Sequence, residues 1–269
     1  MTRLTFLGTS DAMGVPRIYC ECSVCQEARS TGLNRRLRSS VLVEDEAIGR
    51  TVIDCGPDWG RQMAAAGLRG MDRLLLTHAH FDHCGGLPEW ADACRWTGIR
   101  GEAYAPTVVI DEVLQRFPWL DRQIDFHRID GGLTMGGWEI AAWRVNHGKN
   151  GYAYAFRFDH RSSGYAWAYC PDAIALSAEE LAPLQQLDLM VLGTSFFQEP
   201  YPFDTRSVYD VMEGLELVRQ LRPERTVFTH LSHDIDLAVR AQELPGDCCF
   251  AATGMQIELG KRSAPQSRS

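Results

Sequence analysis

Long apolar runs are absent from the 269-residue sequence: none approaches the roughly 18 residues of a membrane-spanning helix. The apolar stretch at the amino terminus is too short for a secretory signal and has no small-residue cleavage site, so we interpret it as a first strand. No internal repeat and no linker rich in Pro, Gly or Ser divides the chain. We therefore expect a cytoplasmic protein without a membrane partner. We also expect one domain over residues 1–260 and a disordered tail over residues 261–269.

An excess of positive charge is also lacking. The 27 Lys and Arg residues face 35 Asp and Glu residues, and the formal net charge of -8 argues against nucleic-acid binding by bulk electrostatics. One local basic cluster either meets an anion or forms a solvated turn: Arg29, Arg35, Arg36 and Arg38. The composition is otherwise ordinary for a globular protein, with 45% hydrophobic residues, and the chain is long enough to bury a substantial core.

Short apolar runs of strand length recur along the whole chain, with helix-like segments between several of them. Two helices carry specific signals. Ser177 and Glu180 have capping-box spacing, and a helix over residues 206–221 has an apolar stripe at Val208, Met212, Leu215 and Val218. The mixture predicts an α/β or α+β fold with mixed sheets. We expect strands at residues 4–8, 39–44, 51–56, 73–78, 138–147, 152–158, 165–170, 187–193, 225–230 and 249–259.

A dense group of potential metal ligands follows one of these strands. Residues 77–86 read THAHFDHCGG, which places His78, His80, Asp82 and His83 within six positions. In an extended segment His78 and His80 point the same way, because side chains repeat every two residues, so both can bind one ion. Asp82 and His83 lie where the chain turns into a helix and can face a second ion beside the first.

This segment resembles the metal-binding segment of the metallo-β-lactamase superfamily, whose fold is an αββα sandwich of two mixed β-sheets flanked by helices. The superfamily takes further ligands from later strand ends, and His147, Asp172 and His230 stand at the matching places. The resemblance implies one ion on His78, His80 and His147, a second on Asp82, His83 and His230, and Asp172 shared between both.

A second cluster, Cys20, Cys22 and Cys25, has the spacing of most of a zinc site but no fourth ligand nearby. The triplet is either a coincidence or completed from far away. The chain start together with residues 20–29 resembles the phosphodiesterases of the phosphoribosyl cyclic phosphate type, which serve bacterial phosphonate breakdown. That resemblance implies a structural zinc on Cys20, Cys22, Cys25 and His233, in an inserted loop at about residues 19–29. The remaining six of the nine cysteines we interpret as core residues.

The function that follows is hydrolysis of a small, cyclic phosphodiester by a hydroxide held between two divalent ions, Mn or Zn, with Asp82 and Asp172 orienting it. The chain departs from the family in one respect, because it has no histidine from residue 173 to residue 229. Asp204 and Arg206 are the candidates there, Arg206 for phosphate contact and Asp204 either as an acid or as the cap of the following helix. His127 and His160 receive no role.

Two other interpretations stay open. A hydrolase of the same fold could act on a thioester, a lactam or an RNA phosphodiester, and a non-catalytic relative could only bind a ligand. The aromatic loop over residues 195–203 could form a lid over the substrate, or bury itself in a second copy of the chain to form a homodimer.

Overall fold

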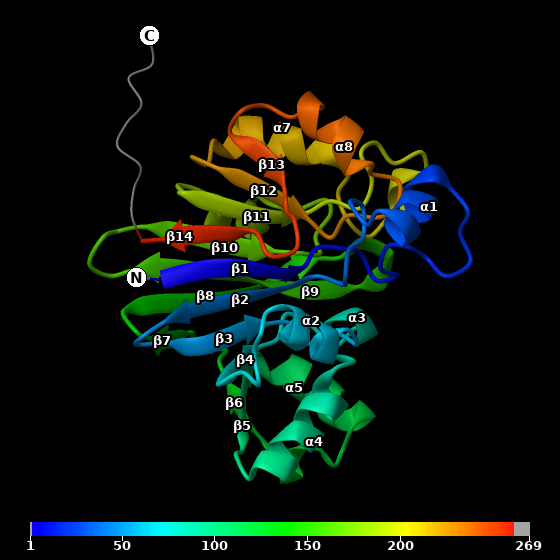
Figure 1. Ribbon diagram of the computed structural model, residues 1–269. Helices are drawn as coiled ribbons and strands as arrows, with labels where there is room; N and C mark the ends of the chain where they lie inside the picture. The colour runs from blue at the N-terminus through cyan, green and yellow to red at the C-terminus, as the bar shows by residue number, and fades with distance from the viewer. Residues whose placement is uncertain (1, 261–269) are drawn as a thin grey trace.

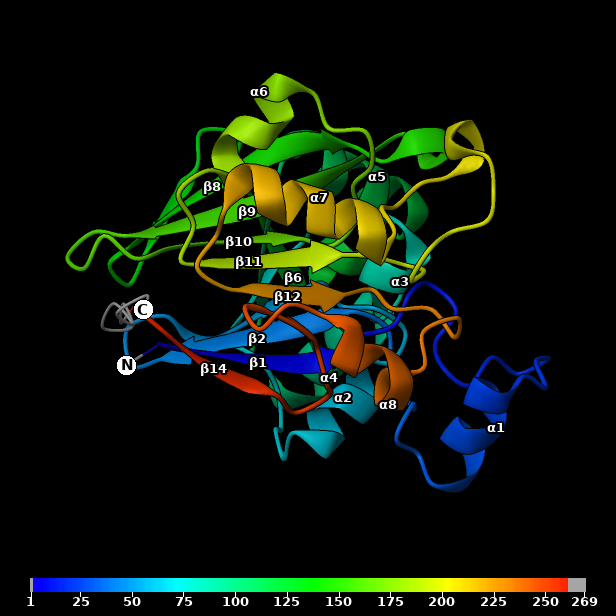
Figure 2. The same ribbon diagram turned by 90° about the horizontal axis from the view of Figure 1, so that it is seen from above.

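Two seven-stranded β-sheets lie face to face in the computed structural model, which describes residues 2–260 (Figure 1). Helices cover the outer face of each sheet, as the view from above also shows (Figure 2). The predicted αββα sandwich of two mixed sheets is confirmed. The predicted tail, residues 261–269, lies outside the described residues.

The first sheet has the strand order β14-β1-β2-β3-β4-β5-β6. Its strands β14, β1, β2 and β3 pair antiparallel, and the pairs from β3 to β6 are parallel. The bounds are β1 Thr2–Gly8, β2 Ser40–Asp45, β3 Gly49–Ile53, β4 Arg73–Leu75, β5 Gly101–Ala105, β6 Ile124–Arg128 and β14 Gln256–Leu259.

The second sheet repeats this plan with the order β13-β12-β11-β10-β9-β8-β7. The pairs from β7 to β10 are antiparallel and those from β10 to β13 are parallel. The bounds are β7 Leu133–Met135, β8 Trp138–Asn146, β9 Tyr152–His160, β10 Ala166–Cys170, β11 Leu189–Gly193, β12 Thr226–Thr229 and β13 Cys248–Phe250.

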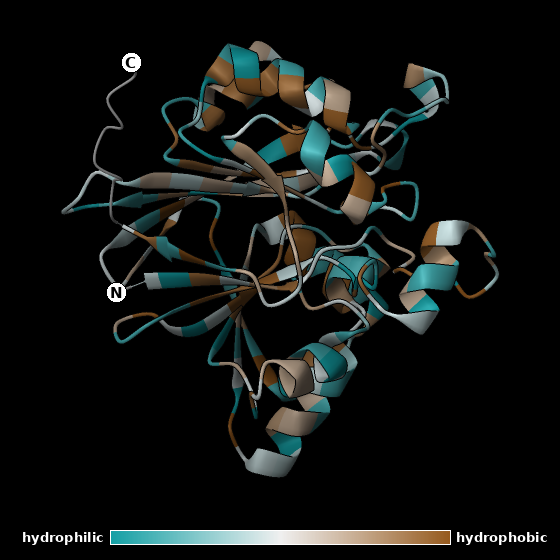
Figure 3. Ribbon diagram, turned by 45° about the horizontal axis from the view of Figure 1, so that its top comes forward, coloured by the Kyte–Doolittle hydropathy of each residue, from teal (hydrophilic) through white to brown (hydrophobic). Residues whose placement is uncertain are grey.

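Strand alternation builds three apolar layers, because successive side chains of a strand point to opposite faces. In β2, Val41 and Val43 enter the core between the sheets, whereas Leu42 faces the outer helices. The inter-sheet core is rich in aromatic rings, and Phe158 stacks on Trp167 with centroids 4.1 Å apart. Hydrophobic and hydrophilic residues alternate along the covering helices, so each helix has one face for a sheet and one for solvent (Figure 3).

The helices cover the sheets in two groups. The first sheet is covered by α2 Trp59–Ala65, α4 Leu87–Thr97 and α5 Thr107–Arg116, and the second by α6 Ala178–Leu181 and α7 Val211–Leu221. Shorter elements are α1 Ser23–Ser30, α3 Phe81–Cys84 and α8 Leu237–Arg240, with 3-10 turns η1 Leu120–Arg122, η2 Gly148–Asn150, η3 Ala182–Leu184, η4 Phe203–Thr205 and η5 Ala241–Glu243.

Several local predictions hold and others fail. The capping box of Ser177 and Glu180 is confirmed at the start of α6. The predicted helix over residues 206–221 begins later, at Val211, because Asp210 caps it, and Met212 of the predicted stripe is 41% exposed. Asp204, considered as the cap of this helix, is therefore not the cap. Residues 249–259 form two strands in different sheets, and β5, β6 and β7 were not predicted. These strands are short or carry polar residues, and only their pairing with neighbours makes them strands.

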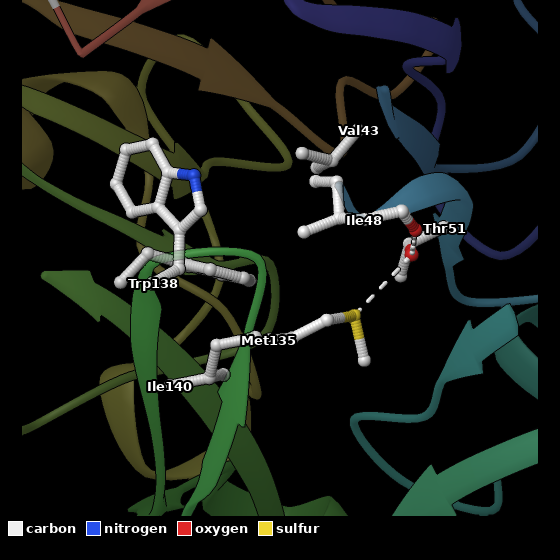
Figure 4. Close-up of a pocket in the computed structure, with 7 residues that line it drawn as sticks. Val43, Ile48, Thr51, Met135, Trp138 and Ile140 are labelled. Carbon is white, nitrogen blue, oxygen red and sulfur yellow. Dashed lines mark hydrogen bonds between the residues drawn. The ribbon is translucent and has the colours of Figure 1, made fainter. Parts of the chain in front are cut away.

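A small apolar cavity lies where the β2–β3 turn meets the β7–β8 hairpin (Figure 4). Its walls include Ile48, Met135 and Trp138, and the hydroxyl of Thr51 lies 3.7 Å from the sulfur of Met135. It faces the start of β8, whereas the charged cluster described below lies beyond the end of that strand. The lining holds no ionisable side chain, so this cavity is a packing feature of the core.

Candidate metal centre

Polar side chains gather at one edge of the sandwich, where five strands end. Asp54 follows β3, His78 follows β4, His147 follows β8, Asp172 follows β10 and His230 follows β12. In layered α/β folds sites lie outside the carboxyl ends of the strands, so chain direction alone brings these groups together. Asp54 and His230 have positive φ angles of 65° and 59°, which few residues other than glycine adopt. Backbone strain of this kind is typical of functional sites.

The first predicted ligand group is brought together. The ligand atoms of His78, His80 and His147 all lie within 4.8 Å of one another. The Nε2 atom of His78 lies 3.0 Å from Nδ1 of His80. Two ligand atoms that share a tetrahedral ion at 2.0–2.2 Å lie about 3.3 Å apart, so this spacing suits a shared ion.

The second predicted group converges beside the first, with Asp172 between them. Asp82, His83 and His230 also offer atoms within 4.8 Å of one another, and His83 Nε2 lies 3.2 Å from Asp82 Oδ2. The two oxygens of Asp172 lie 2.8 Å from His83 Nε2 and 3.2 Å from His230 Nε2. They also lie 3.9 Å from His78 Nε2 and 4.0 Å from His147 Nε2, so Asp172 reaches both groups.

Unsatisfied polar atoms show that this cluster suits cations. His83 Nε2, Asp172 Oδ2 and both ring nitrogens of His230 are buried, and although His83, His230 and Asp172 lie close together, none of these atoms makes a well-aligned hydrogen bond among the described residues. His83 is only 1% exposed and Asp172 1% exposed, so water does not compensate them. Buried polar atoms without partners are costly, and a divalent ion with imidazole and carboxylate ligands removes that cost. The residues therefore fit two metal ions.

The cluster also shifts the pKa values of its members. Burial opposes the charged form of His83, but Asp82, Asp54 and Asp172 outweigh burial and raise its pKa well above the usual value. Burial, reinforced by the neighbouring His83, lowers the pKa of His78 well below the usual value. Burial opposes the ionised form of Asp172 as well, yet His230 and His83 hold its pKa well below the ordinary range. Opposite charges thus stabilise one another in a dry site.

Asp54 and Thr77 orient the imidazole rings, and the sequence analysis did not identify either residue. His83 Nδ1 donates to Asp54 Oδ2 over 2.7 Å, which turns its Nε2 toward Asp82 and Asp172. Thr77 Oγ1 lies 2.9 Å from His78 Nδ1 and donates to the same carboxylate over 2.9 Å. Such partners fix ring orientation and tautomer in metal sites. The signal in the sequence was the position of Asp54, an acidic residue directly after an apolar strand.

The cysteine cluster has the predicted distant fourth member. Nδ1 of His233 lies 3.2 Å from Cys20 Sγ, 3.5 Å from Cys22 Sγ and 3.4 Å from Cys25 Sγ. Zinc ligated at about 2.3 Å by sulfur and about 2.0 Å by nitrogen in tetrahedral geometry places S and N about 3.5 Å apart. The four atoms therefore stand where a closed zinc site would hold them. Figure 2 shows α1 projecting from the body of the molecule beside this cluster.

The basic cluster predicted to meet an anion or form a solvated turn is divided. Arg29 and Arg35 are exposed, Arg38 pairs with the carboxylate of Asp58 over 2.9 Å, and all four side chains donate to backbone carbonyls. Arg36 is 2% exposed and donates to the carbonyls of Ser232 and Ile235. Burial lowers its pKa to about 10. Arg29 donates to the carbonyl of Cys20, and Arg35 and Arg38 bind other carbonyls around the cysteine loop. The arginines hold the loop to the body of the protein.

The two predicted substrate residues differ in environment. Asp204 lies in η4 and is exposed. Arg206 is 6% exposed, and its guanidinium contacts Glu199, Asp210 and Glu213. A guanidinium with three carboxylate neighbours is not available for a phosphate, so the predicted phosphate contact is replaced by a structural one.

The unassigned histidines lie among other partners. His127 Nε2 is 2.5 Å from Glu102 Oε2, and His160 Nδ1 is 2.8 Å from Ser163 Oγ. Five of the six remaining cysteines are buried and Cys249 is half-buried, as predicted for core residues.

The fold and the edge cluster define a metallo-β-lactamase-type scaffold with a candidate metal centre. The chain belongs to the β-lactamase superfamily, since the family model "Beta-lactamase superfamily domain" matches residues 49–231. The predicted relation to the PhnP type is confirmed by a crystal structure described as a new diphosphatase from the PhnP family. That structure has 28% sequence identity and a TM-score of 0.83, covering 96% of this chain and 98% of its own.

Among the curated relatives that match in sequence are a transferase and a nuclease. An octanoyltransferase of Porphyromonas gingivalis is 26% identical over 245 residues, which are 87% of this chain and 47% of that protein. A ribonuclease Z of Bradyrhizobium diazoefficiens is 41% identical over 90 residues, 33% of this chain and 24% of that protein. The chain thus spans less than half the length of these relatives. No helix among residues 2–260 is long and apolar enough to cross a membrane.

Proposed function

We propose that this protein is a metal-dependent phosphodiesterase that hydrolyses a small phosphodiester, such as a cyclic ribose phosphate. The observation that carries the proposal is the convergence of His78, His80 and His147 with Asp82, His83 and His230 around Asp172. The relation to a PhnP-family diphosphatase supports a phosphorus-centred substrate. The formal charge of -8 weighs against RNA as the natural substrate.

Each residue of the cluster would have a specific role in binding the ions. His78, His80 and His147 would hold one ion, Asp82, His83 and His230 would hold the other, and Asp172 would be shared by both. Two divalent ions in such a site supply a hydroxide at neutral pH and neutralise charge on the phosphate. Asp54 holds His83 and Thr77 holds His78 in the required orientation. A structural zinc on Cys20, Cys22, Cys25 and His233 would stabilise the adjoining loop, because closed four-ligand sites leave no position for substrate.

Two residues of the η2 turn, Lys149 and Asn150, are our candidates for contact with the substrate. Nδ2 of Asn150 lies 3.5 Å from Nε2 of His147, the ring nitrogen that faces the cluster. Its neighbour Lys149 is exposed. An amide donor and an ammonium group at the rim suit phosphate oxygens. Asp204 stays a proposed acid for the leaving group, and the homodimer and cytoplasmic location stay predictions.

The direct test is hydrolysis of bis(p-nitrophenyl) phosphate by metal-stripped protein with and without added Mn or Zn. We expect metal-dependent turnover that a chelator stops, and loss of turnover in Asp172→Ala. A cyclic ribose phosphate, a diphosphate ester, a short RNA, a thioester and a lactam are then compared under the same conditions. Turnover of the thioester or lactam without turnover of any phosphate ester would overturn the proposal, and turnover of none would favour a binding role.

Asn150 supplies a second test of the same proposal. Asn150→Ala should raise KM for the phosphodiester roughly tenfold while metal content stays constant, because the lost amide contacts substrate and not the ions. Asn146→Ala is not a suitable control, since Asn146 bonds the backbone beside Asp172. Gln115→Ala, an exposed change on α5, is the matched control and should leave KM unaltered.

A further inference from the structure

Arg206 lies at the centre of an ion-pair network beside the loop that carries His147. Its Nε is 3.0 Å from Glu199, and its two terminal nitrogens lie 2.9 and 2.6 Å from the carboxylate oxygens of Glu213. Asp210 lies 3.4 Å away and caps α7. The network therefore ties the backbone at residue 206 to the first turn of a helix that packs on the second sheet.

The backbone at residues 206 and 207 contacts the loop that carries His147. The carbonyl of Ser207 accepts a hydrogen bond from His147 Nδ1 over 2.7 Å, and the carbonyl of Arg206 accepts one from Lys149 N over 3.2 Å. Gly148 lies so close that a Cβ there would stand 2.1 Å from the Arg206 carbonyl oxygen. Only a glycine allows this approach.

We propose that Arg206 is a positioning residue for His147: its ion pairs fix the Ser207 carbonyl, which holds the imidazole ring in its ligating orientation, and the Arg206 carbonyl, which holds the backbone of the loop beside it. The inference rests on the metal centre of the proposed function, but it concerns ion binding and not the bond that is cleaved. The segment that lacks a histidine thus acts through its backbone.

The chemical reason is the tautomer of His147. A neutral imidazole has one N–H and one lone pair, and the ring nitrogen that binds a metal must carry the lone pair. Because Nδ1 donates to a carbonyl, Nε2 keeps its lone pair, and this atom lies 4.0 Å from Asp172. If the carbonyl moves away from Nδ1, the imidazole of His147 loses both its tautomer preference and its fixed orientation. Loss of such a partner typically weakens metal binding by about 10–100-fold.

Two variants test this role from opposite sides of the contact. Arg206→Lys keeps one positive charge but removes the planar fork that reaches several carboxylates. Gly148→Ala leaves the ion pairs intact and drives the Arg206 carbonyl away through the added methyl group. Gly98→Ala is the matched control. Both glycines have a positive φ angle, +69° for Gly98 and +54° for Gly148. Nothing lies within 4 Å of a Cβ added at Gly98, which is the C-cap of α4 and is remote from the metal centre.

The measurement is titration of metal-stripped protein with Co(II), followed by its visible absorption in competition with a chelating dye. His147→Ala and His230→Ala provide the reference curves for loss of each ion. We expect Arg206→Lys and Gly148→Ala to lower the affinity for one of the two ions by about 10–100-fold and to reproduce the titration curve of His147→Ala. Gly98→Ala should match the unaltered protein.

Unchanged affinity in a folded Arg206→Lys variant, or equal weakening of the binding of both ions, would overturn the proposal. A general loss of folding in Arg206→Lys would leave Gly148→Ala to decide, since that variant retains the ion pairs. The readout contains no substrate, so a failure of the phosphodiesterase assay does not affect it.

Discussion

His230 and His233 are three residues apart and face two different ligand clusters. Nε2 of His230 lies 3.2 Å from Asp172, whereas Nδ1 of His233 lies 3.2 Å from the sulfur of Cys20. Between them, the carbonyl of Ser232 accepts a hydrogen bond from buried Arg36, and the nitrogen of Leu231 donates to the carbonyl of Thr9. One short loop, fixed at two places to the amino-terminal part of the chain, thus serves both clusters.

Asp172 is the carboxylate that lies near both histidine groups. Asp172→Ala should lower kcat of the phosphodiester hydrolysis by about 100–1000-fold, which is the loss typical for removal of one electrostatic group at a reacting centre. The fold should persist, because the removed charge is buried among ligands and not in the apolar core. Activity and circular dichroism are measured on the same preparation. A folded and fully active variant would show that Asp172 does not bridge the ions.

The carboxylate of Asp54 accepts hydrogen bonds from His83 and Thr77, next to the predicted metal ligands. Asp54→Asn keeps the shape of the side chain but leaves one acceptor oxygen, whereas the carboxylate accepts from His83 Nδ1 on one oxygen and from Thr77 N on the other. In either orientation of the amide, one of these donors faces the NH2 group. We expect metal affinity to fall about 10–100-fold, measured by dye competition. Asp92→Asn, an exposed change on α4, serves as the control. Wild-type affinity in Asp54→Asn would remove Asp54 from the support of the site.

Variants of Cys22 distinguish a stabilising effect of zinc binding from one of helix capping. It is exposed and caps α1 by accepting from Cys25 N. Cys22→Ala and Cys22→Ser should each lose about one zinc per chain and lower Tm, because a closed site contributes folding energy. Serine retains the capping acceptor, so a Tm restored in Cys22→Ser would mean that capping and not zinc stabilises the loop. Metal analysis and thermal unfolding provide the data.

Asp45 makes folding stability depend on pH away from the metal centre. Burial opposes its ionised form, but bonds from Thr2 Oγ1, Ile48 N and Ala47 N outweigh burial and lower its pKa below the ordinary 3.8. Because the pKa of Asp45 is lower in the folded than in the unfolded state, its ionised form stabilises the fold at pH values above 3.8. This contribution is lost as the pH falls from 3.8 through the lower pKa of the folded state. Asp45→Asn should therefore be less stable by about 1 kcal/mol at neutral pH.

The stability difference between Asp45→Asn and the unaltered protein should shrink as the pH falls below about 4. Urea unfolding at several pH values measures it, and Glu46→Gln, an exposed neighbouring change, should differ by less than about 0.5 kcal/mol throughout. A difference that stays constant from neutral to acid pH would show that the charge of Asp45 is not responsible.

The sequence by itself determined the kind of fold and the main ligand candidates. The density of His78, His80, Asp82 and His83 after an apolar strand is a local pattern, and its meaning does not depend on distant residues. The strands that carry later candidates are apolar enough to be recognised singly. The resemblance to the metallo-β-lactamase superfamily implied that His147, Asp172 and His230 join them, and the structure brings these residues to the same edge.

Only the tertiary structure decided which partners each polar group has. Arg36 and Arg206 look alike in sequence as cations near a site, yet both are buried, one on carbonyls and the other among carboxylates. Asp54 looks like an ordinary strand-end residue until His83, 29 residues away, donates to it. The strands β5 to β7 also need neighbours to pair with. Hydrogen bonds and ion pairs between distant segments depend on packing geometry, which no local spacing encodes.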